Sequence, residues 1–302
     1  MVDYIKIMVR NLTASEIDAV CHGQAFTVAR DRVQDKDRGE KINYWGMTMI
    51  LNPIKRTLEV KGALPTFANG NNLHLLTYSE MVSTCINLAT ATGLPGSRLT
   101  LVNLELSNDI DPTTSPQSFF ESLQHHKGSK FIATKPGKGV TRPLEYCALH
   151  ADYTVKIYDK GEWTKHDDNH LPTGQHRMRF EVVYGRARSI NILWNRSETT
   201  LADLISLEFY AAAAVQLKQQ WEKVVRQQPL DFTGLKKSDQ LLLGAGANPE
   251  YWRELKTRCA HITYKRTRKK YGELVKASAE RVGRTHIPNG FHLLSLRCYL
   301  RR

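Results

Sequence analysis

The sequence is poor in cysteine, and its five cysteines have none of the spacings that let thiols act together. Their number is odd, and no Cys-x-x-Cys pair occurs. This pattern argues against a disulfide framework or a zinc finger, and it is typical of ordinary thiols in a reducing compartment. The five positions are Cys21, Cys85, Cys147, Cys259 and Cys298.

Long apolar runs and nucleotide-binding loops are missing as well. No stretch of about eighteen apolar residues occurs, as a membrane span would require. The first ten residues carry Asp3, Lys6 and Arg10, where a signal peptide has an apolar core. No Gly-x-x-x-x-Gly-Lys-Ser/Thr loop for ATP phosphates is found. We therefore expect a cytoplasmic protein without a membrane span or a secretion signal.

Positive charge is abundant, and it is unevenly placed along the chain. The 302 residues have a formal net charge of +13. Residues 229–302 contain 16 Lys and Arg against 6 Asp and Glu, whereas residues 1–228 contain 27 against 24. A basic module that follows a nearly neutral body indicates a polyanionic partner, and nucleic acid is favoured over a merely solvated basic face.

Alternation of side chains and turn residues predict strands, whereas capping residues and longer apolar periods predict helices. The body is expected to form strands at 4–10, 42–51, 56–62, 99–107, 152–159 and 177–184, and helices at 78–92, 116–126 and 199–226. The tail is expected to form helices at 237–243, 249–258 and 264–282.

These elements predict an α+β fold with a central, mainly antiparallel sheet and helices packed on one face. A small, basic, helical C-terminal domain follows. The predicted boundary divides the chain into a body of residues 1–228 and a tail domain of residues 229–302.

Three of the predicted strands have one polar face, because neighbouring side chains along a strand point to opposite faces. The polar faces hold Glu105 from residues 101–107, Lys156 and Tyr158 from residues 153–159, and Arg179 and Glu181 from residues 177–182. If the three strands share a sheet, these groups converge on its open face.

Such a face has the residues for cutting a phosphodiester. Glu105 and Glu181 are predicted to hold Mg²⁺ or Mn²⁺, with Asp109 or Asp159 as helpers. A tyrosine beside the cation can attack the phosphorus, and lysine or arginine can neutralise the developing charge. The plainer alternative is that each glutamate is a solvated strand residue and that Tyr158 is ordinary strand packing.

At these residues the chain resembles the gene II-type rolling-circle replication initiators of filamentous phages and their plasmid relatives. The resemblance covers roughly residues 1–225 and depends on the order and spacing of several stretches. They are Leu51-Asn-Pro-Ile-Lys-Arg-Thr-Leu-Glu-Val-Lys-Gly62, Phe67-Ala-Asn-Gly70, Leu101-Val-Asn-Leu-Glu-Leu-Ser107, Phe119-Phe-Glu-Ser-Leu-Gln-His-His-Lys-Gly128, Tyr153-Thr-Val-Lys-Ile-Tyr-Asp-Lys-Gly161 and Met178-Arg-Phe-Glu181.

The resemblance implies a site-specific nickase whose tyrosine stays on the 5′ phosphate and later rejoins the displaced strand. The family's Tyr-x-Lys pattern matches Tyr158-Asp-Lys160, its acidic strand residue falls on Glu105, and its Arg-Phe-Glu falls on 179–181. Many rolling-circle initiators also carry a His-hydrophobic-His metal motif, which none of the eleven histidines here forms. The resemblance therefore implies a carboxylate metal site, and the host's replication helicase or polymerase are candidate partners.

Within the tail, a basic segment is the predicted grip on duplex origin DNA, while the body handles the single-stranded nick site. It runs from Tyr264 to Tyr271, and its basic residues are Lys265, Arg266, Arg268, Lys269 and Lys270. Two rivals remain: a tyrosine recombinase, which the strand-borne Tyr158 disfavours, and a non-catalytic origin-binding protein that controls copy number. The sequence leaves the origin, the host, a phage or plasmid source and the oligomeric state open.

Overall fold

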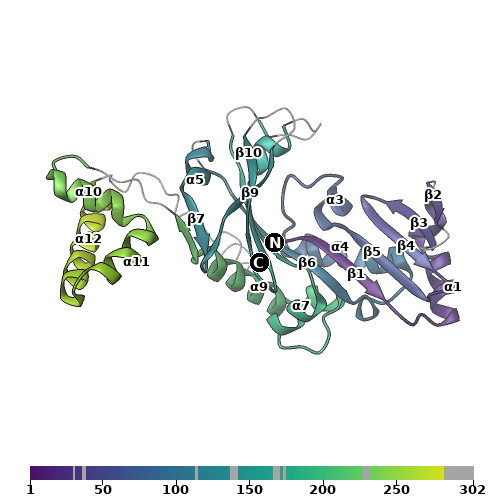
Figure 1. The fold of residues 1–302 in the computed structure, drawn as a ribbon. Coiled ribbons are helices and arrows are strands. Elements are labelled where there is room, and N and C mark those ends of the chain that lie inside the picture. The colour runs from purple at the N-terminus through teal and green to yellow at the C-terminus, as the bar shows by residue number, and fades with distance from the viewer. Residues whose placement is uncertain are drawn as a thin grey trace. The chain divides into compact units, whose positions relative to one another are not determined.

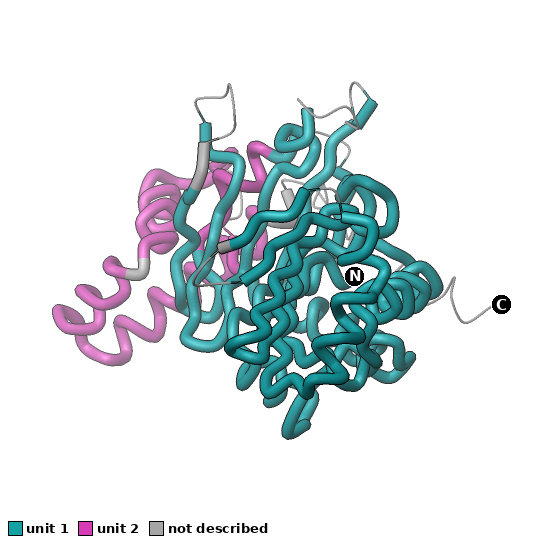
Figure 2. The backbone as a smooth tube through the Cα atoms, turned by 90° about the vertical axis from the view of Figure 1, so that its right-hand side faces the viewer, with its two compact units in different colours: residues 1–116, 125–224, 290–302 teal, residues 117–124, 225–289 magenta. Residues whose placement is uncertain are grey.

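The computed structural model describes residues 1–29, 31–35, 39–112, 115–136, 142–165, 171–172, 175–226 and 232–281 (Figure 1). It divides into two compact units (Figure 2). The first takes in residues 1–116 and 125–224, and the second takes in residues 117–124 and the described part of 225–289.

A ten-stranded sheet forms the centre of the first unit. Its strand order is β2-β3-β4-β5-β1-β6-β12-β11-β10-β9, and every neighbouring pair is antiparallel. The strands are β1 (Val2–Val9), β2 (Arg32–Asp35), β3 (Gly39–Tyr44), β4 (Met47–Asn52), β5 (Thr57–Ala63), β6 (Leu101–Ile110), β9 (Ile132–Pro136), β10 (Pro143–Leu149), β11 (Thr154–Asp159) and β12 (Met178–Tyr184).

Helices pack on this sheet and bury its apolar side chains. Helices α7 (Ala187–Leu193) and α9 (Leu207–Trp221) contact β6 and β12, and the ring of Phe180 meets that of Trp221 edge-on at 5.2 Å between centroids. The other helices of the unit are α1 (Ala14–His22), α2 (Gln24–Val28), α3 (Leu64–Asn69), α4 (Tyr78–Thr92), α6 (Lys160–Trp163) and α8 (Leu201–Leu204). The predicted α+β fold with a large antiparallel sheet and packed helices is confirmed.

Helix α4 shows how local sequence fixes an element. Thr77 caps it in a capping box with Glu80, and Gly93 ends it in the left-handed conformation with φ 74°. Only a residue without a Cβ adopts that conformation cheaply, and a Cβ at Gly93 would also clash with the Ala19 carbonyl. The prediction of residues 78–92 is therefore confirmed at both ends.

Three predicted elements are wrong in detail. Residues 42–51 are not one strand but a hairpin, because Trp45 and Gly46 form a two-residue turn between β3 and β4. Residues 116–126 begin as α5 (Gln117–Ser122) but continue as strand β7 (Leu123–His126), which pairs with β8 (Ser129–Lys130).

The third is the single long helix predicted over 199–226. It is divided into α8 and α9, and the chain continues into strand β13 (Val224–Arg226). The Ser206 hydroxyl accepts a hydrogen bond from the backbone N–H of Phe209 at 3.0 Å, so it begins a new helix. Ser206, which lies in the middle of the stretch with helical periodicity, is thus the N-cap of α9.

The second unit contains three helices of the basic tail: α10 (Lys237–Gly246), α11 (Pro249–Arg258) and α12 (His261–Arg281). Trp252 packs between them, donating its indole N–H to the Gly246 carbonyl at 2.7 Å and meeting the Tyr271 ring at 5.2 Å. The predicted helix at 249–258 is confirmed, and that at 264–282 begins three residues earlier. Residues 282–302 of the predicted tail domain lie outside the described chain. Among the described residues, no helix is long and apolar enough to cross a membrane.

Candidate active site

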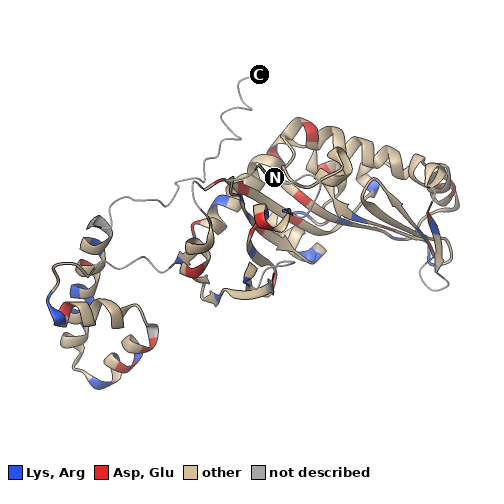
Figure 3. Ribbon diagram, turned by 90° about the horizontal axis from the view of Figure 1, so that it is seen from above, with Lys and Arg blue, Asp and Glu red and all other residues tan. Residues whose placement is uncertain are grey.

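The three strands predicted to carry chemistry are neighbours in the sheet, in the order β6-β12-β11. Residues directly opposite one another in an antiparallel sheet point to the same face. Tyr158 lies opposite Arg179, which lies opposite Asp109 on β6. Lys156 lies opposite Glu181, which lies opposite Ser107. The alternation of the sequence therefore predicted this polar face correctly. Figure 3 colours the acidic and basic positions along the whole ribbon.

Tyr158 is held by Glu181. Its hydroxyl donates a hydrogen bond to Oε1 of Glu181 at 2.7 Å, and its ring meets Trp163 edge-on. The side chain is only 8% exposed. Burial raises the pKa of the Tyr158 phenol well above its ordinary value, and the charge of Glu181 raises it further.

Lys156 lies between the two glutamates predicted to bind metal. Its Nζ is 3.6 Å from Oε1 of Glu105 and 3.6 Å from Oε2 of Glu181. Burial raises the pKa of Glu181 to about 8, and the nearby Asp3 and Glu105 carboxylates add to the rise. Burial also raises the pKa of Glu105. The pKa of Lys156 is raised as well, because the two glutamates outweigh the effect of burial. The structure thus brings all three predicted residues together.

Arg179 lies at the centre of a buried network and has 0% of its surface exposed. Its guanidinium donates to Asp109 at 2.6 Å and to Asp3 at 2.9 Å, and it also bonds Asn72 and the Leu73 carbonyl. The pKa of Arg179 is raised, because Asp109 and Asp3 outweigh the opposing effect of burial. In this arrangement the guanidinium positions its neighbours and is committed to protein groups.

Asp3 is a site residue that the sequence did not reveal. Its Oδ2 accepts from Arg179 and from the Ser107 hydroxyl, while its buried Oδ1 has no hydrogen-bond partner. A β-bulge in the pairing of β1 with β6, between Val2 and Ile5, places Asp3 beside this polar face. The only hint in the sequence was its charge, which β1 also carries at Lys6.

The residues after Tyr158 have different surroundings. Asp159 caps α6 by accepting from the Glu162 N–H at 2.9 Å, which fits a cap better than a metal helper. Lys160 is 5% exposed, and among the described residues its ammonium forms no ion pair. Burial lowers the pKa of Lys160 to about 8, and the charge of Arg179 contributes to the shift. Lys160 therefore exchanges a proton more readily than a surface lysine.

The two neighbouring tyrosines do not reach this polar face. Tyr153 stacks on His150 and donates to Gln220 on α9. Tyr184 is buried, and its hydroxyl accepts a hydrogen bond from Gln216 on α9 at 3.2 Å. Both therefore belong to the helix-covered side of the sheet.

The predicted metal site has carboxylate oxygens as its available donors. Among the described residues, no group of three or more His, Cys, Asp or Glu side chains is arranged to hold a metal ion. Two carboxylates nevertheless share a neighbour, since Glu105 and Glu181 each lie 3.6 Å from Nζ of Lys156. The unpartnered Oδ1 of Asp3 is a hard oxygen donor of the kind that Mg²⁺ and Mn²⁺ prefer. These oxygen donors are of the type that suits such a cation, while Lys156 now pairs with both glutamates.

The basic residues of α12 divide into two groups. Lys270 pairs with Asp239, and Arg268 donates to the Tyr264 hydroxyl and lies over the Trp252 ring. Lys269 lies 4.0 Å from Glu273. Lys265 and Arg266 are exposed and form no ion pair with any described residue. All five side chains are exposed, and in the described chain Lys265, Arg266 and Lys269 are the three with no contact to another helix or to an aromatic ring.

No family model and no curated protein matches this chain. Among solved structures it is similar to a rolling-circle replication initiator protein from Geobacillus stearothermophilus, at 10% identity and a TM-score of 0.43, over 79% of this chain and 89% of that one. It is also similar to the di-domain ARO/CYC protein BexL of the BE-7585A biosynthetic pathway, at 11% identity and a TM-score of 0.23, over 73% of this chain and 95% of that one. Scores this low carry no argument about function, so a functional proposal has to depend on the geometry of the site itself.

Proposed function

We propose that this chain initiates rolling-circle DNA replication by nicking one strand, with Tyr158 as the nucleophile. The observation that carries the proposal is the 2.7 Å hydrogen bond from the Tyr158 hydroxyl to Glu181. A phenol needs a base to act near neutral pH, and a carboxylate whose pKa is raised to about 8 is a better base than an ordinary one.

In the proposed step, Oη of Tyr158 attacks the phosphorus, and its proton passes to Oε1 of Glu181. The P–O bond to the 3′ oxygen breaks, leaving a phosphotyrosine link to the 5′ side. The departing 3′ oxygen takes a proton, for which Lys160 is the proposed donor because its pKa is lowered to about 8. The reverse sequence rejoins a strand. Lys156, whose Nζ lies 3.6 Å from Glu181, stabilises the negative charge that develops on the attacked phosphate. Arg179 holds the carboxylates of Asp3 and Asp109 in place.

Glu105 and Glu181, together with the free oxygen of Asp3, would hold Mg²⁺ or Mn²⁺, which would polarise the phosphoryl oxygen. The tail is proposed to bind duplex origin DNA through phosphates, mainly by Lys265, Arg266 and Lys269, with Arg268 and Lys270 supporting the helix. The body, residues 1–228, is then the nicking domain, and residues 229–302 are the DNA-binding domain.

Mass spectrometry of a covalent peptide–oligonucleotide adduct tests the proposal. Wild-type protein is expected to yield an adduct on the peptide that contains Tyr158, and Tyr158→Phe should yield none while keeping its circular dichroism and its affinity for DNA. Tyr153→Phe and Tyr184→Phe are the matched controls, because each removes one hydroxyl from the other side of the sheet. An adduct that persists in Tyr158→Phe but disappears in either control overturns the assignment.

A second candidate function is origin binding without catalysis, as in copy-number control. The observation in its favour is the burial of Tyr158, since a phenol with a strongly raised pKa does not ionise readily. Such a protein would bind origin DNA through its tail and leave supercoiled plasmid uncut with any divalent metal. A nicking assay with Mn²⁺ separates the two functions.

A further inference from the structure

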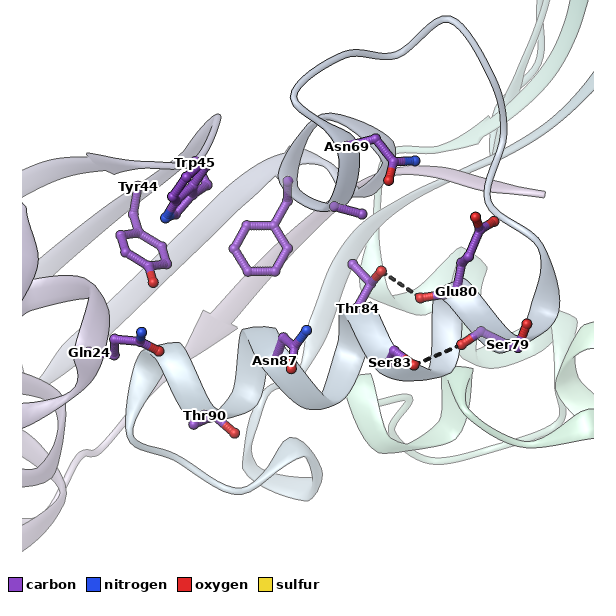
Figure 4. Close-up of a pocket in the computed structure, with 12 residues that line it drawn as sticks. Gln24, Tyr44, Trp45, Asn69, Ser79, Glu80, Ser83, Thr84, Asn87 and Thr90 are labelled. Carbon is purple, nitrogen blue, oxygen red and sulfur yellow. Dashed lines mark hydrogen bonds between the residues drawn. The ribbon is translucent and has the colours of Figure 1, made fainter.

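A hollow in the first unit lies between the β3–β4 turn and helices α3 and α4, and none of the polar-face residues named above lines it. Its volume is about 690 Å³, which is within the range of small-ligand pockets. Aromatic rings from Tyr44, Trp45 and Phe67 line it, and Figure 4 shows Tyr44 and Trp45 across from Asn87 of α4. We call it the Trp45 hollow.

Trp45 is exposed at a backbone position that does not suit it. Tyr44 pairs with Met47, so Trp45 and Gly46 form a two-residue hairpin turn, and their φ angles are 48° and 82°. Both values are those of a type I′ turn, whose first central position favours Asn, Asp or Gly. A bulky residue with positive φ is an outlier and carries strain. The side chain is nevertheless 69% exposed, so packing does not explain why tryptophan stands there.

The turn is held firmly against α3. A Cβ at Gly46 would lie 2.6 Å from Cγ2 of Thr66, and the φ of 82° also favours glycine there. The Tyr44 ring lies 6.5 Å from Trp45 and 6.2 Å from Phe67 between centroids. The rings are therefore presented by a fixed scaffold and not by a loose loop.

The chemistry of the hollow is aromatic and amide-rich, and it lacks cations. None of its lining residues is Lys or Arg, and its single carboxylate, that of Glu80, accepts from the backbone N–H of Thr77 in the α4 cap. The side-chain amides of Gln24 and Asn87 form no hydrogen bond with any described residue, so a ligand can use both their donors and their acceptors. A phosphate would find no positively charged partner here. A flat, neutral group with a hydrogen-bonding edge would find both aromatic rings and amide partners.

We propose that the Trp45 hollow binds an unpaired nucleobase of single-stranded DNA by stacking on Trp45 and by hydrogen bonds to Gln24 and Asn87. This inference rests on the proposed function, because a nickase must hold a strand whose bases are unpaired. Aromatic side chains stack on every base, so the hollow would bind bases with little sequence preference. An aromatic side chain of a partner protein would fit less well, since it would leave the amides without partners.

The experiment measures binding of a labelled oligo-dT 12-mer and of an abasic 12-mer with the same backbone, by fluorescence anisotropy. Full-length Tyr158→Phe protein serves as the background, so that no cleavage occurs. Adding Trp45→Ala is expected to weaken oligo-dT binding about tenfold and to leave abasic binding unchanged. Asn87→Ala should weaken oligo-dT binding by less. Ile54→Ala is the matched control, because it removes a 92% exposed side chain from the next hairpin turn.

Three results overturn the inference: unchanged oligo-dT binding by the Trp45→Ala variant, equal losses for the two probes, or no single-strand binding by the parent protein. The proposed function is judged separately, by the adduct on Tyr158. Adduct formation with a saturating oligonucleotide should survive Trp45→Ala. If the hollow fails this test but the adduct forms, the proposed nickase activity is retained. If the hollow passes but no adduct forms, the chain is a single-strand binding protein without nickase activity.

Discussion

The hydroxyl of Tyr158 and the carboxylate of Glu181 are joined by a 2.7 Å hydrogen bond between neighbouring strands. Glu181 is fully buried, and its pKa is raised to about 8 from the ordinary 4.5 of a glutamate. The pair therefore couples a phenol that resists ionisation to a carboxylate that holds its proton until the solution is mildly alkaline. This coupling has consequences for pH dependence.

The first prediction concerns the rate of nicking against pH. Only ionised Glu181 can accept the Tyr158 proton, so the rate should rise about tenfold per pH unit below the raised pKa. Above about pH 8 it should fall again, because Lys160 loses the proton that it donates to the 3′ oxygen. Single-turnover nicking of supercoiled plasmid measures it. Glu181→Gln should lose this rise together with most of the activity. A wild-type rate that is flat from about pH 5 to about pH 8 contradicts the assignment of Glu181 as base.

The same raised pKa has a definite sign for stability. The folded state binds the Glu181 proton more tightly than the unfolded state, so this contribution is complete below about pH 4.5 and is lost as pH rises to about 8. Urea unfolding at several pH values, with Glu181→Gln as reference, isolates the contribution. The wild type should lose stability relative to the variant across this window. A constant difference would show that Glu181 titrates normally.

At this site the sequence predicted some side-chain positions and not others. Period-two alternation predicted which side chains of β6, β11 and β12 share a face, because side-chain direction along a strand is a local property. It could not predict Asp3, because the bulge that brings it there arises in the pairing of β1 with β6, a hundred residues apart in the chain. Nor could it predict that Lys156 would lie between two glutamates, since that depends on three strands together.

The turn at Trp45 was missed for a different reason. Tryptophan favours strands, so residues 42–51 predicted one continuous strand. The hairpin requires Trp45 to adopt a positive φ, and local propensity argues against that conformation for a bulky residue. The sequence therefore did not predict it. Places where local preference and structure disagree in this way are often functional.

A further prediction concerns metal. Excess chelator should abolish nicking, and Mn²⁺ or Mg²⁺ should restore it, because Glu105 and Glu181 share only Lys156 and one oxygen of Asp3 has no hydrogen-bond partner. Glu105→Gln should raise the Mn²⁺ concentration needed for half-maximal nicking. Glu59→Gln is the matched control, since Glu59 is paired with Lys6 and Lys61 at 3.0 Å. Full activity in chelator would remove the metal from the proposal.

The tail is predicted to bind duplex DNA chiefly through phosphates. Replacing Lys265, Arg266 and Lys269 together by alanine should weaken duplex binding and reduce the slope of log affinity against log salt by roughly 0.9 for each lost phosphate contact. Fluorescence anisotropy between low and physiological salt measures the slope. Lys218→Ala, which removes a half-exposed cation from α9 of the first unit, is the control for net charge. An unchanged slope in the triple variant would place the DNA contact elsewhere.

The last prediction separates strain from function at Trp45. Asn accepts the positive φ of 48° that tryptophan and alanine both resist, so Trp45→Asn should be more stable than Trp45→Ala by about 1 kcal/mol. Both variants lose the same ring contact with Tyr44, so their difference reports the backbone alone. Urea unfolding followed by circular dichroism gives the comparison. Both variants should nevertheless lose oligo-dT binding to the same extent, since neither offers a ring. If Trp45→Asn is no more stable than Trp45→Ala, the turn is not strained, and the tryptophan needs no binding role to explain it.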